Sequence, residues 1–166
     1  MSANARGLEL NLDDALPTEG DILFAMQRQR TRIVQRMDRG IDADGQPFAP
    51  YSPAYAKKRD KSGRNVSPVD LTWSGRMRNS MQVSADNFRL GPGASEERIG
   101  LKDFKSKARQ GRVGIYDPEN AAKAEGHNEG TAKLPRRHFL DSSPEDNRNV
   151  ALDLEERWAQ RFRARR

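Results

Sequence analysis

Leu134-Pro135-Arg136-Arg137-His138-Phe139-Leu140 is the stretch of this sequence that decides the fold. Apolar residues close it, and its proline restricts the backbone to an extended path. A polar, glycine-containing stretch at residues 127–131 precedes it, and residues 141–146 carry the signals of a helix start. An extended segment between a turn and a helix cap is typical of a fixed structural joint. We expect the joint to consist of Pro135, Arg136, Arg137, Phe139 and Leu140.

The length and composition predict one domain with a thin core. The chain has 166 residues, of which 34% are hydrophobic and 33% are charged. We expect a single domain over residues 18–163, an arm or edge strand at residues 1–17 and a basic tail end at residues 164–166. Because so small a core stabilises a domain poorly, association with other subunits could complete the fold.

The net charge and the lack of cysteine limit the kinds of partner and of metal site that this chain can have. The chain contains no cysteine, which excludes disulfides and thiolate metal sites. It has no apolar run of the roughly 20 residues that a membrane span needs, so we expect no membrane partner. The net charge of +6 is compatible with nucleic acid, with an acidic protein partner or with solubility alone.

Capping residues and hydrophobic periodicity predict the elements. A helix is expected from Thr18 to Gly40, with an arginine-rich face that is solvated or contacts phosphates. A second helix is expected after Ser143, where an apolar stripe recurs every four residues from Val150 to Phe162. Thr72 or Ser74 should cap a short helix in which Trp73 is expected to be a core residue, with a ligand platform as the alternative role. A further short helix should end at Gly126. Other expected elements are a strand at 8–12, a short helix after Ser52 and strands at 82–85, 88–90, 98–101 and 112–116.

Two basic loops are the candidate contact surfaces. The first covers residues 57–69 and is expected to lack apolar anchors, and the second covers residues 102–111. Either loop could follow a phosphate backbone, dock on an acidic protein or be plain surface. The candidate contact residues are Lys57, Lys58, Arg59, Lys61, Arg64, Lys102, Lys105, Lys107 and Arg109.

The sequence offers no clear catalytic or metal motif. Residues 42–45 lack the later ligands of a calcium loop. His127 and His138 could join Glu125 or Glu129 in a mixed metal site, but nothing in the spacing fixes its geometry. The sequence has no nucleophile elbow, phosphate-binding glycine loop or dinucleotide fingerprint. We therefore expect no catalytic residue, no cofactor and no metal ligand.

Four short motifs, in this order, resemble those of tailed-bacteriophage morphogenesis proteins, a group that includes tail-completion and head–tail connector (neck) proteins. DGQPFAPYS at residues 44–52 is similar to the pattern G-x-P-W/F-x-P-L/Y-S/T of the group. LTWSGRMRNSM at residues 71–81 resembles its L-x-x-S/T-G-x-L-x-x-S-L/M helix. HNEG at 127–130 and PRRHFL at 135–140 resemble its H-x-x-G turn and its P-x-R-x-F-L/I signature.

The resemblance implies an α+β fold, with a small, mostly antiparallel sheet flanked by a long N-terminal helix and a C-terminal helix. It implies a structural virion part without catalytic residues, made in the bacterial cytoplasm. Such a part would form a homo-oligomeric ring, by expectation a hexamer, around the DNA channel where tail meets head. Its partners would be itself, neighbouring neck and tail proteins and, passively, genomic DNA. The joint would then lie at or near a subunit interface.

Two other functions stay open on the sequence alone. A nucleic-acid-binding module would use the basic loops without forming a ring. A small nuclease or metal hydrolase would use the histidines, and its activity would depend on a metal ion.

Overall fold

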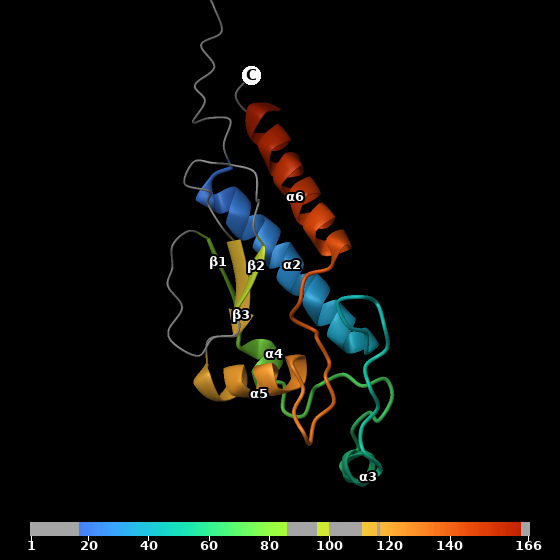
Figure 1. Ribbon diagram of the computed structural model, residues 1–166. Coiled ribbons are helices and arrows are strands. Elements are labelled where there is room, and N and C mark those ends of the chain that lie inside the picture. Colours follow the sequence, from blue (N-terminus) through green and yellow to red (C-terminus); the bar gives the residue numbers. More distant parts are fainter. Residues whose placement is uncertain (1–16, 86–95, 100–110, 116, 164–166) are drawn as a thin grey trace, which may run out of the picture.

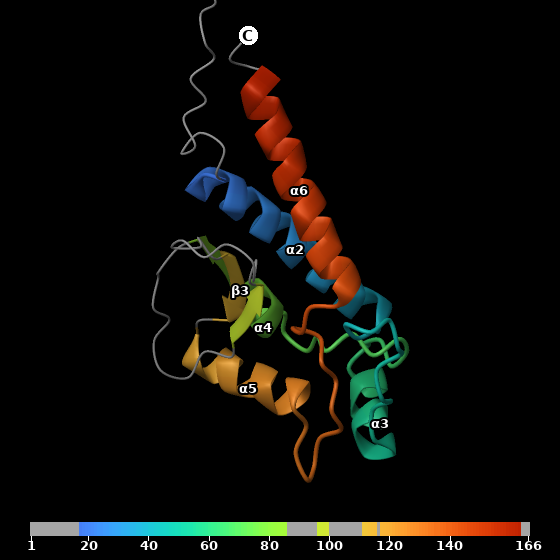
Figure 2. The same ribbon diagram turned by 45° about the horizontal axis from the view of Figure 1, so that its top comes forward.

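A long helix, α2 (Glu19–Arg39), lies at the centre of the molecule, between a small sheet and the C-terminal helix α6 (Pro144–Arg163) (Figures 1 and 2). The computed structural model describes residues 17–85, 96–99, 111–115 and 117–163. Expectations for the N-terminal arm, the strand at 88–90, nearly all of the 102–111 loop and the tail end fall outside these residues. The predicted α+β class, with its two flanking helices, is confirmed.

The sheet is antiparallel, and its last strand lies in the middle. The order is β1 (Met81–Ala85), β3 (Gly111–Ile115) and β2 (Glu96–Ile99). Met81 pairs with Ile115 across β1 and β3, and Glu96 pairs with Gly114 across β2 and β3. A Cβ atom at Gly111 would lie only 2.5 Å from Cγ of Met26. The absence of a side chain there lets α2 pack closely on the sheet.

The termini of α2 follow from its capping residues. The hydroxyl of Thr18 accepts the N–H of Asp21, and the Asp21 carboxylate accepts the N–H of Thr18, which forms a capping box. Gly40 ends the helix in the left-handed region, at φ 70°. Between these ends, the apolar stripe predicted from the sequence is buried: Ile22, Met26, Ile33 and Met37.

Ion pairs, rather than an apolar stripe, dominate the contact between α2 and α6. Asp153 of α6 is approached by Arg28 at 3.0 Å and by Arg32 at 2.5 Å, and Asp146 pairs with Arg36. The arginine face, expected to be solvated or to contact phosphates or an acidic partner, is therefore largely occupied by α6 of the same chain. The predicted apolar stripe of α6 is only partly correct, because Val150 is buried whereas Trp158 is 41% exposed.

Three shorter helices complete the described chain: α3 (Pro53–Lys61), α4 (Arg76–Asn79) and α5 (Pro118–Asn128). Residues 57–61, expected to be loop, belong to α3. The N-cap of α4 is Gly75, without a side-chain hydrogen bond, so the prediction of Thr72 or Ser74 was wrong. α5 continues through Gly126, which we expected to end it. Glycine weakens a helix without necessarily stopping it.

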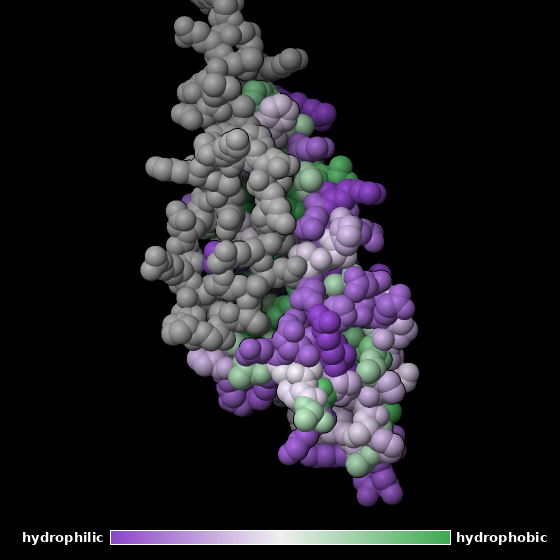
Figure 3. Space-filling model, viewed as in Figure 1, coloured by the Kyte–Doolittle hydropathy of each residue, from purple (hydrophilic) through white to green (hydrophobic). Residues whose placement is uncertain are grey.

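The surface is consistent with the composition. Figure 3 shows one face on which hydrophilic side chains predominate and hydrophobic patches are small and scattered. None of the described helices is long and apolar enough to cross a membrane.

Candidate functional site

The predicted joint links segments that are far apart in the sequence. Phe139 is fully buried, and Leu140 is buried beside it. Arg137 is also buried, and its Nε and Nη2 donate to the carbonyl oxygens of Ala49 and Pro50 at 2.9 and 3.1 Å. The joint therefore fastens the extended segment before α3 to the chain that leads into α6.

The joint also holds the end of α5. The N–H of Arg137 donates to the carbonyl oxygen of His127 at 2.7 Å. Gly130 adopts a φ of 77°, and a Cβ atom there would lie 2.9 Å from the nitrogen of Arg136. Pro135 and Arg136 are exposed. Of the five joint residues, these two are the ones whose side chains lie on the surface, while the others serve the interior.

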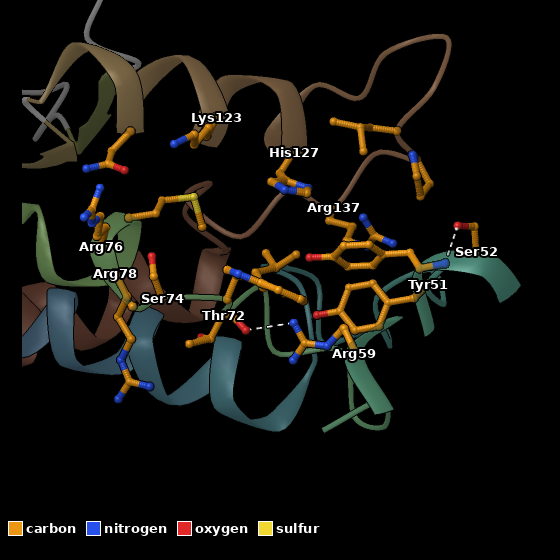
Figure 4. A pocket seen from close by; sticks show the side chains of 18 of the residues that line it. Tyr51, Ser52, Arg59, Thr72, Ser74, Arg76, Arg78, Lys123, His127 and Arg137 are labelled. Carbon is orange, nitrogen blue, oxygen red and sulfur yellow. Dashed lines mark hydrogen bonds between the residues drawn. The ribbon is translucent and has the colours of Figure 1, made fainter. Parts of the chain in front are cut away.

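A cavity of about 560 Å³ opens between the joint, α3, α4 and α5 (Figure 4). We call it the cationic pocket. Lys123 and His127 reach into it from α5, opposite Tyr51 and Arg59. Among the described residues, every charged side chain of the lining is basic and none is a carboxylate. These basic residues are Arg59, Arg76, Arg78, Lys123, Lys133 and Arg137.

Aromatic rings form one wall of the cationic pocket. The rings of Tyr51 and Tyr55 lie 5.2 Å apart, edge to face, and Tyr55 lies 5.8 Å from Trp73. The charged ends of Arg64 and Lys58 lie over Trp73, at 4.6 and 5.3 Å from its ring centre. Trp73 therefore lines the pocket rather than the core, which corrects the sequence-based prediction.

Arg59 is buried beneath this aromatic wall, where it was expected to be an exposed contact residue. Its exposed fraction is 1%. Its guanidinium donates to the carbonyl oxygens of Asn65 and Thr72, at 2.6 and 2.8 Å, and to the Asp70 carboxylate at 2.9 Å. The planar guanidinium group of arginine carries several N–H donors and can therefore bond to several acceptors at once. Arg59 therefore holds the loop after α3 in place, and its hydrogen-bond donors are directed to acceptors within the chain.

The backbone next to Asp70 is strained. Leu71 has a φ of 53°, which is uncommon for a residue with a branched side chain. Its neighbours hold it there, because Asp70 accepts the N–H of Thr72 at 2.9 Å as well as the Arg59 guanidinium. Strain of this kind persists where the surroundings determine the conformation. Here it presents Thr72 and Trp73 to the cationic pocket.

The pocket environment shifts the pKa values of three lining groups. Burial raises the pKa of Tyr51. Burial and, secondarily, the nearby Arg137 charge lower the pKa of His127. Burial also lowers the pKa of Arg137. His127 is therefore a neutral ring at neutral pH, and the positive charge of the pocket comes from its arginines and lysines.

The structure brings together only part of the predicted contact set. Arg59 lines the pocket, and Lys58 and Arg64 lie over Trp73 of its wall without lining it. Lys57 and Lys61 are exposed on α3 outside the lining. Lys102, Lys105, Lys107 and Arg109 lie outside the described residues. Arg76, Lys123 and Lys133 line the pocket but were not among the residues expected to contact a partner. They come from separate elements, and no local spacing in the sequence connects them.

This arrangement suits an acidic segment that also carries an aromatic or apolar side chain. Arg76 and Lys133 form no salt bridge within the described part of the chain, although Arg76, after Lys123, helps to lower the pKa of Glu119, so both can still pair with an incoming anion. Tyr55 and Trp73 offer faces on which a ring can stack. The cationic pocket is the strongest candidate for a docking site in the described structure.

Comparison with known proteins identifies the family. The profile of the phage virion morphogenesis family matches residues 25–159. The chain belongs to this family. The match includes the joint, the cationic pocket and most of both long helices, and it confirms the resemblance carried by the four motifs. As a member of the phage virion morphogenesis family, the protein has a role in building the phage particle. No curated protein and no solved structure significantly matches the chain.

Proposed function

We propose that this protein is a non-enzymatic structural part of the virion that joins tail to head. In this role it acts as a tail-completion or neck protein and forms a homo-oligomeric ring, six-fold by expectation, around the DNA channel. Its partners are copies of itself and the neighbouring neck and tail proteins, and passing DNA is contacted only passively.

The observation that carries this proposal is a carboxylate-free cationic pocket in a member of the phage virion morphogenesis family. An acidic segment of a neighbouring chain could occupy it. A ring requires head-to-tail contacts that use two different surfaces of each subunit, and a concave pocket supplies one of them. The small hydrophobic content also favours a chain that assembly stabilises further.

The test is the mass of the purified protein, measured by light scattering after size exclusion at several protein concentrations. Negative-stain electron microscopy of any large species then shows whether it is a closed ring. A closed ring with a channel wide enough for duplex DNA supports the proposal. A protein that stays monomeric both alone and when mixed with the phage's neck and tail proteins contradicts it.

The runner-up function is a nucleic-acid-binding module, favoured by the net charge of +6. It predicts tight DNA binding at physiological salt, with a steep loss of affinity as salt rises. Titrating a labelled 30-base-pair duplex at several salt concentrations separates the two functions. A ring component that lets DNA slide through should bind weakly at physiological salt.

A further inference from the structure

His138 lies among three carboxylates contributed by two distant parts of the chain. Its Nε2 is 3.3 Å from Oδ2 of Asp42 and 3.8 Å from Oδ2 of Asp44. On the other side of the ring, Nδ1 is 3.1 Å from Oδ2 of Asp141. From the sequence, His138 could meet Glu125 or Glu129, but the structure pairs it instead with these aspartates.

Backbone hydrogen bonds hold these groups in place. Oδ1 of Asp42 accepts the N–H groups of Asp44 and Gln46 at 3.0 and 2.8 Å, which leaves Oδ2 on the side of His138. The N–H of Ala43 donates to the carbonyl oxygen of His138 at 3.1 Å. The loop after α2 and the joint are thus already fastened together, and the side chains meet without any rearrangement of the backbone.

The contact with Asp141 determines which ring nitrogen of His138 presents a lone pair to a ligand. A carboxylate at Nδ1 favours the tautomer that carries its proton there, and Nε2 then presents a lone pair toward Asp42 and Asp44. Asp141 is itself held, because its Oδ1 accepts the side-chain amide of Asn128 at 2.9 Å. A lone pair facing a 12%-exposed carboxylate at 3.3 Å is repulsive unless a proton on Nε2 or a metal cation lies between them.

We propose that Asp42, Asp44 and His138 bind a divalent transition-metal ion of the Zn²⁺ type. Their ligand atoms lie within 4.8 Å of one another. Ligands at about 2.0–2.2 Å from zinc stand roughly 3.4 Å apart in a tetrahedron, close to the two distances at Nε2. The Asp44 side chain is 62% exposed and free to turn inward. Asp141 orients the imidazole without binding the metal.

The donor set selects the metal. One imidazole nitrogen with two carboxylate oxygens suits zinc and its neighbours in the transition series. Calcium requires six to eight oxygen ligands, and magnesium gives up its water reluctantly, so both should bind far more weakly. The bound ion would fasten the loop after α2 to the joint, with coordination positions left for water.

Calorimetric titration with Zn²⁺ in a non-chelating buffer at pH 7.5 tests the proposal. The wild-type protein should bind one equivalent per chain, and Mg²⁺ at the same concentration should give no comparable binding. His138→Gln and Asp42→Asn should each weaken Zn²⁺ binding at least tenfold. Asp141→Asn should weaken it by about 10–100-fold, as loss of an orienting partner does. His127→Gln is the matched control, because the chain has only two histidines, and it should bind as the wild type does.

A second measurement detects binding in the wild-type protein and needs a variant only to assign the histidine signal. In the ¹⁵N-labelled wild-type protein, Zn²⁺ should shift the Nε2 resonance of one histidine, and the shifted signal should be the one missing from His138→Gln. Equal Mg²⁺ and Zn²⁺ affinity, no Zn²⁺ binding, or Zn²⁺ binding that survives both His138→Gln and Asp42→Asn would overturn the proposal.

Discussion

Among single residues, Phe139 makes the main packing contribution of the joint. Its ring is completely buried in the core cluster, whereas Leu134, in the same segment, is 39% exposed. Truncating a buried phenylalanine removes its contacts and leaves a cavity. We expect Phe139→Ala to lower the free energy of unfolding by about 3–5 kcal/mol. Chemical denaturation measures the loss, and Leu134→Ala is the control, expected to cost less than about 1 kcal/mol. A loss below 1 kcal/mol for Phe139→Ala would show that the segment is no joint.

His127 gives the fold a dependence on pH. Burial, followed by the Arg137 charge, holds its pKa below the ordinary 6.5. Below about pH 6.5 the unfolded chain therefore binds a proton that the folded chain does not. The free energy of unfolding should fall as pH drops from 7 toward the folded pKa.

The wild-type protein is compared with His127→Gln, whose side chain at this position does not titrate in this pH range. Urea denaturation of both proteins at pH 7.5, 6.5 and 5.5 measures the effect. The stability difference should shift in favour of His127→Gln as the pH falls. A difference that is constant with pH would contradict the depressed pKa.

At the scale of elements, Asp146 is central to the contact between α2 and α6. It accepts the N–H of Ser143 at 3.0 Å and pairs with Arg36, and its side chain is 5% exposed. Removing one partner of a buried ion pair leaves the other charge uncompensated. We expect Asp146→Asn to lower the free energy of unfolding by about 3–5 kcal/mol at pH 7. Glu145→Gln, an exposed neighbour in the same helical turn, is the control and should change it by less than about 0.5 kcal/mol.

The stability that Asp146 contributes should also depend on pH in the acidic range. Burial alone would raise the pKa of Asp146, but the Ser143 N–H and the Arg36 guanidinium outweigh it and hold the pKa below its usual value. Its contribution is present above the unfolded pKa, near 3.8, and is lost as pH falls through the lower folded pKa. The cost of Asp146→Asn should therefore shrink on acidification below pH 4, as acid titration followed by circular dichroism would show. An unchanged cost at low pH would contradict this account.

Element termini were predictable where a local capping signal exists. Thr18, Gly40 and Ser52 mark their helix ends in the sequence as they do in the structure. Prediction failed where the outcome depended on distant partners. Nothing local shows that Arg32 faces Asp153, 121 residues later, so its helix face was predicted to be solvated or to contact an outside partner.

For the whole molecule, the sequence predicted the fold class and the joint better than the candidate site. The joint is contiguous, and a proline, a buried aromatic residue and a helix cap all signal it locally. The cationic pocket is assembled from Tyr51, Trp73, Lys123 and other residues that only the tertiary fold brings together. Arg59 was misplaced for the same reason, because its partner Asp70 lies in the following loop and their contact follows no helical or strand spacing.

Charge-reversal variants can distinguish a specific role of the cationic pocket in assembly from a general effect of positive charge. Arg76 and Lys133 line the pocket and are exposed, whereas Lys57 and Lys61 are equally exposed but lie outside it. None of the four forms a salt bridge among the described residues, and the attraction between Arg76 and Glu119 involves an exposed carboxyl that water screens. Neither double reversal should therefore change the melting temperature by more than about 2 °C. If a neighbouring chain docks an acidic segment in the pocket, Arg76→Glu/Lys133→Glu should reduce the assembled fraction seen by light scattering, alone or with neck and tail proteins.

Lys57→Glu/Lys61→Glu changes the net charge by the same amount and should leave assembly intact, since steering by overall charge is largely screened at physiological salt. A DNA-binding module makes a different prediction, in which each lost phosphate contact weakens DNA binding and lowers its salt dependence by a similar step for both pairs. Equal effects of the two double variants on assembly would therefore remove the cationic pocket from the mechanism. Loss of assembly confined to the Arg76 and Lys133 pair would identify the pocket as the surface through which this protein joins its neighbours.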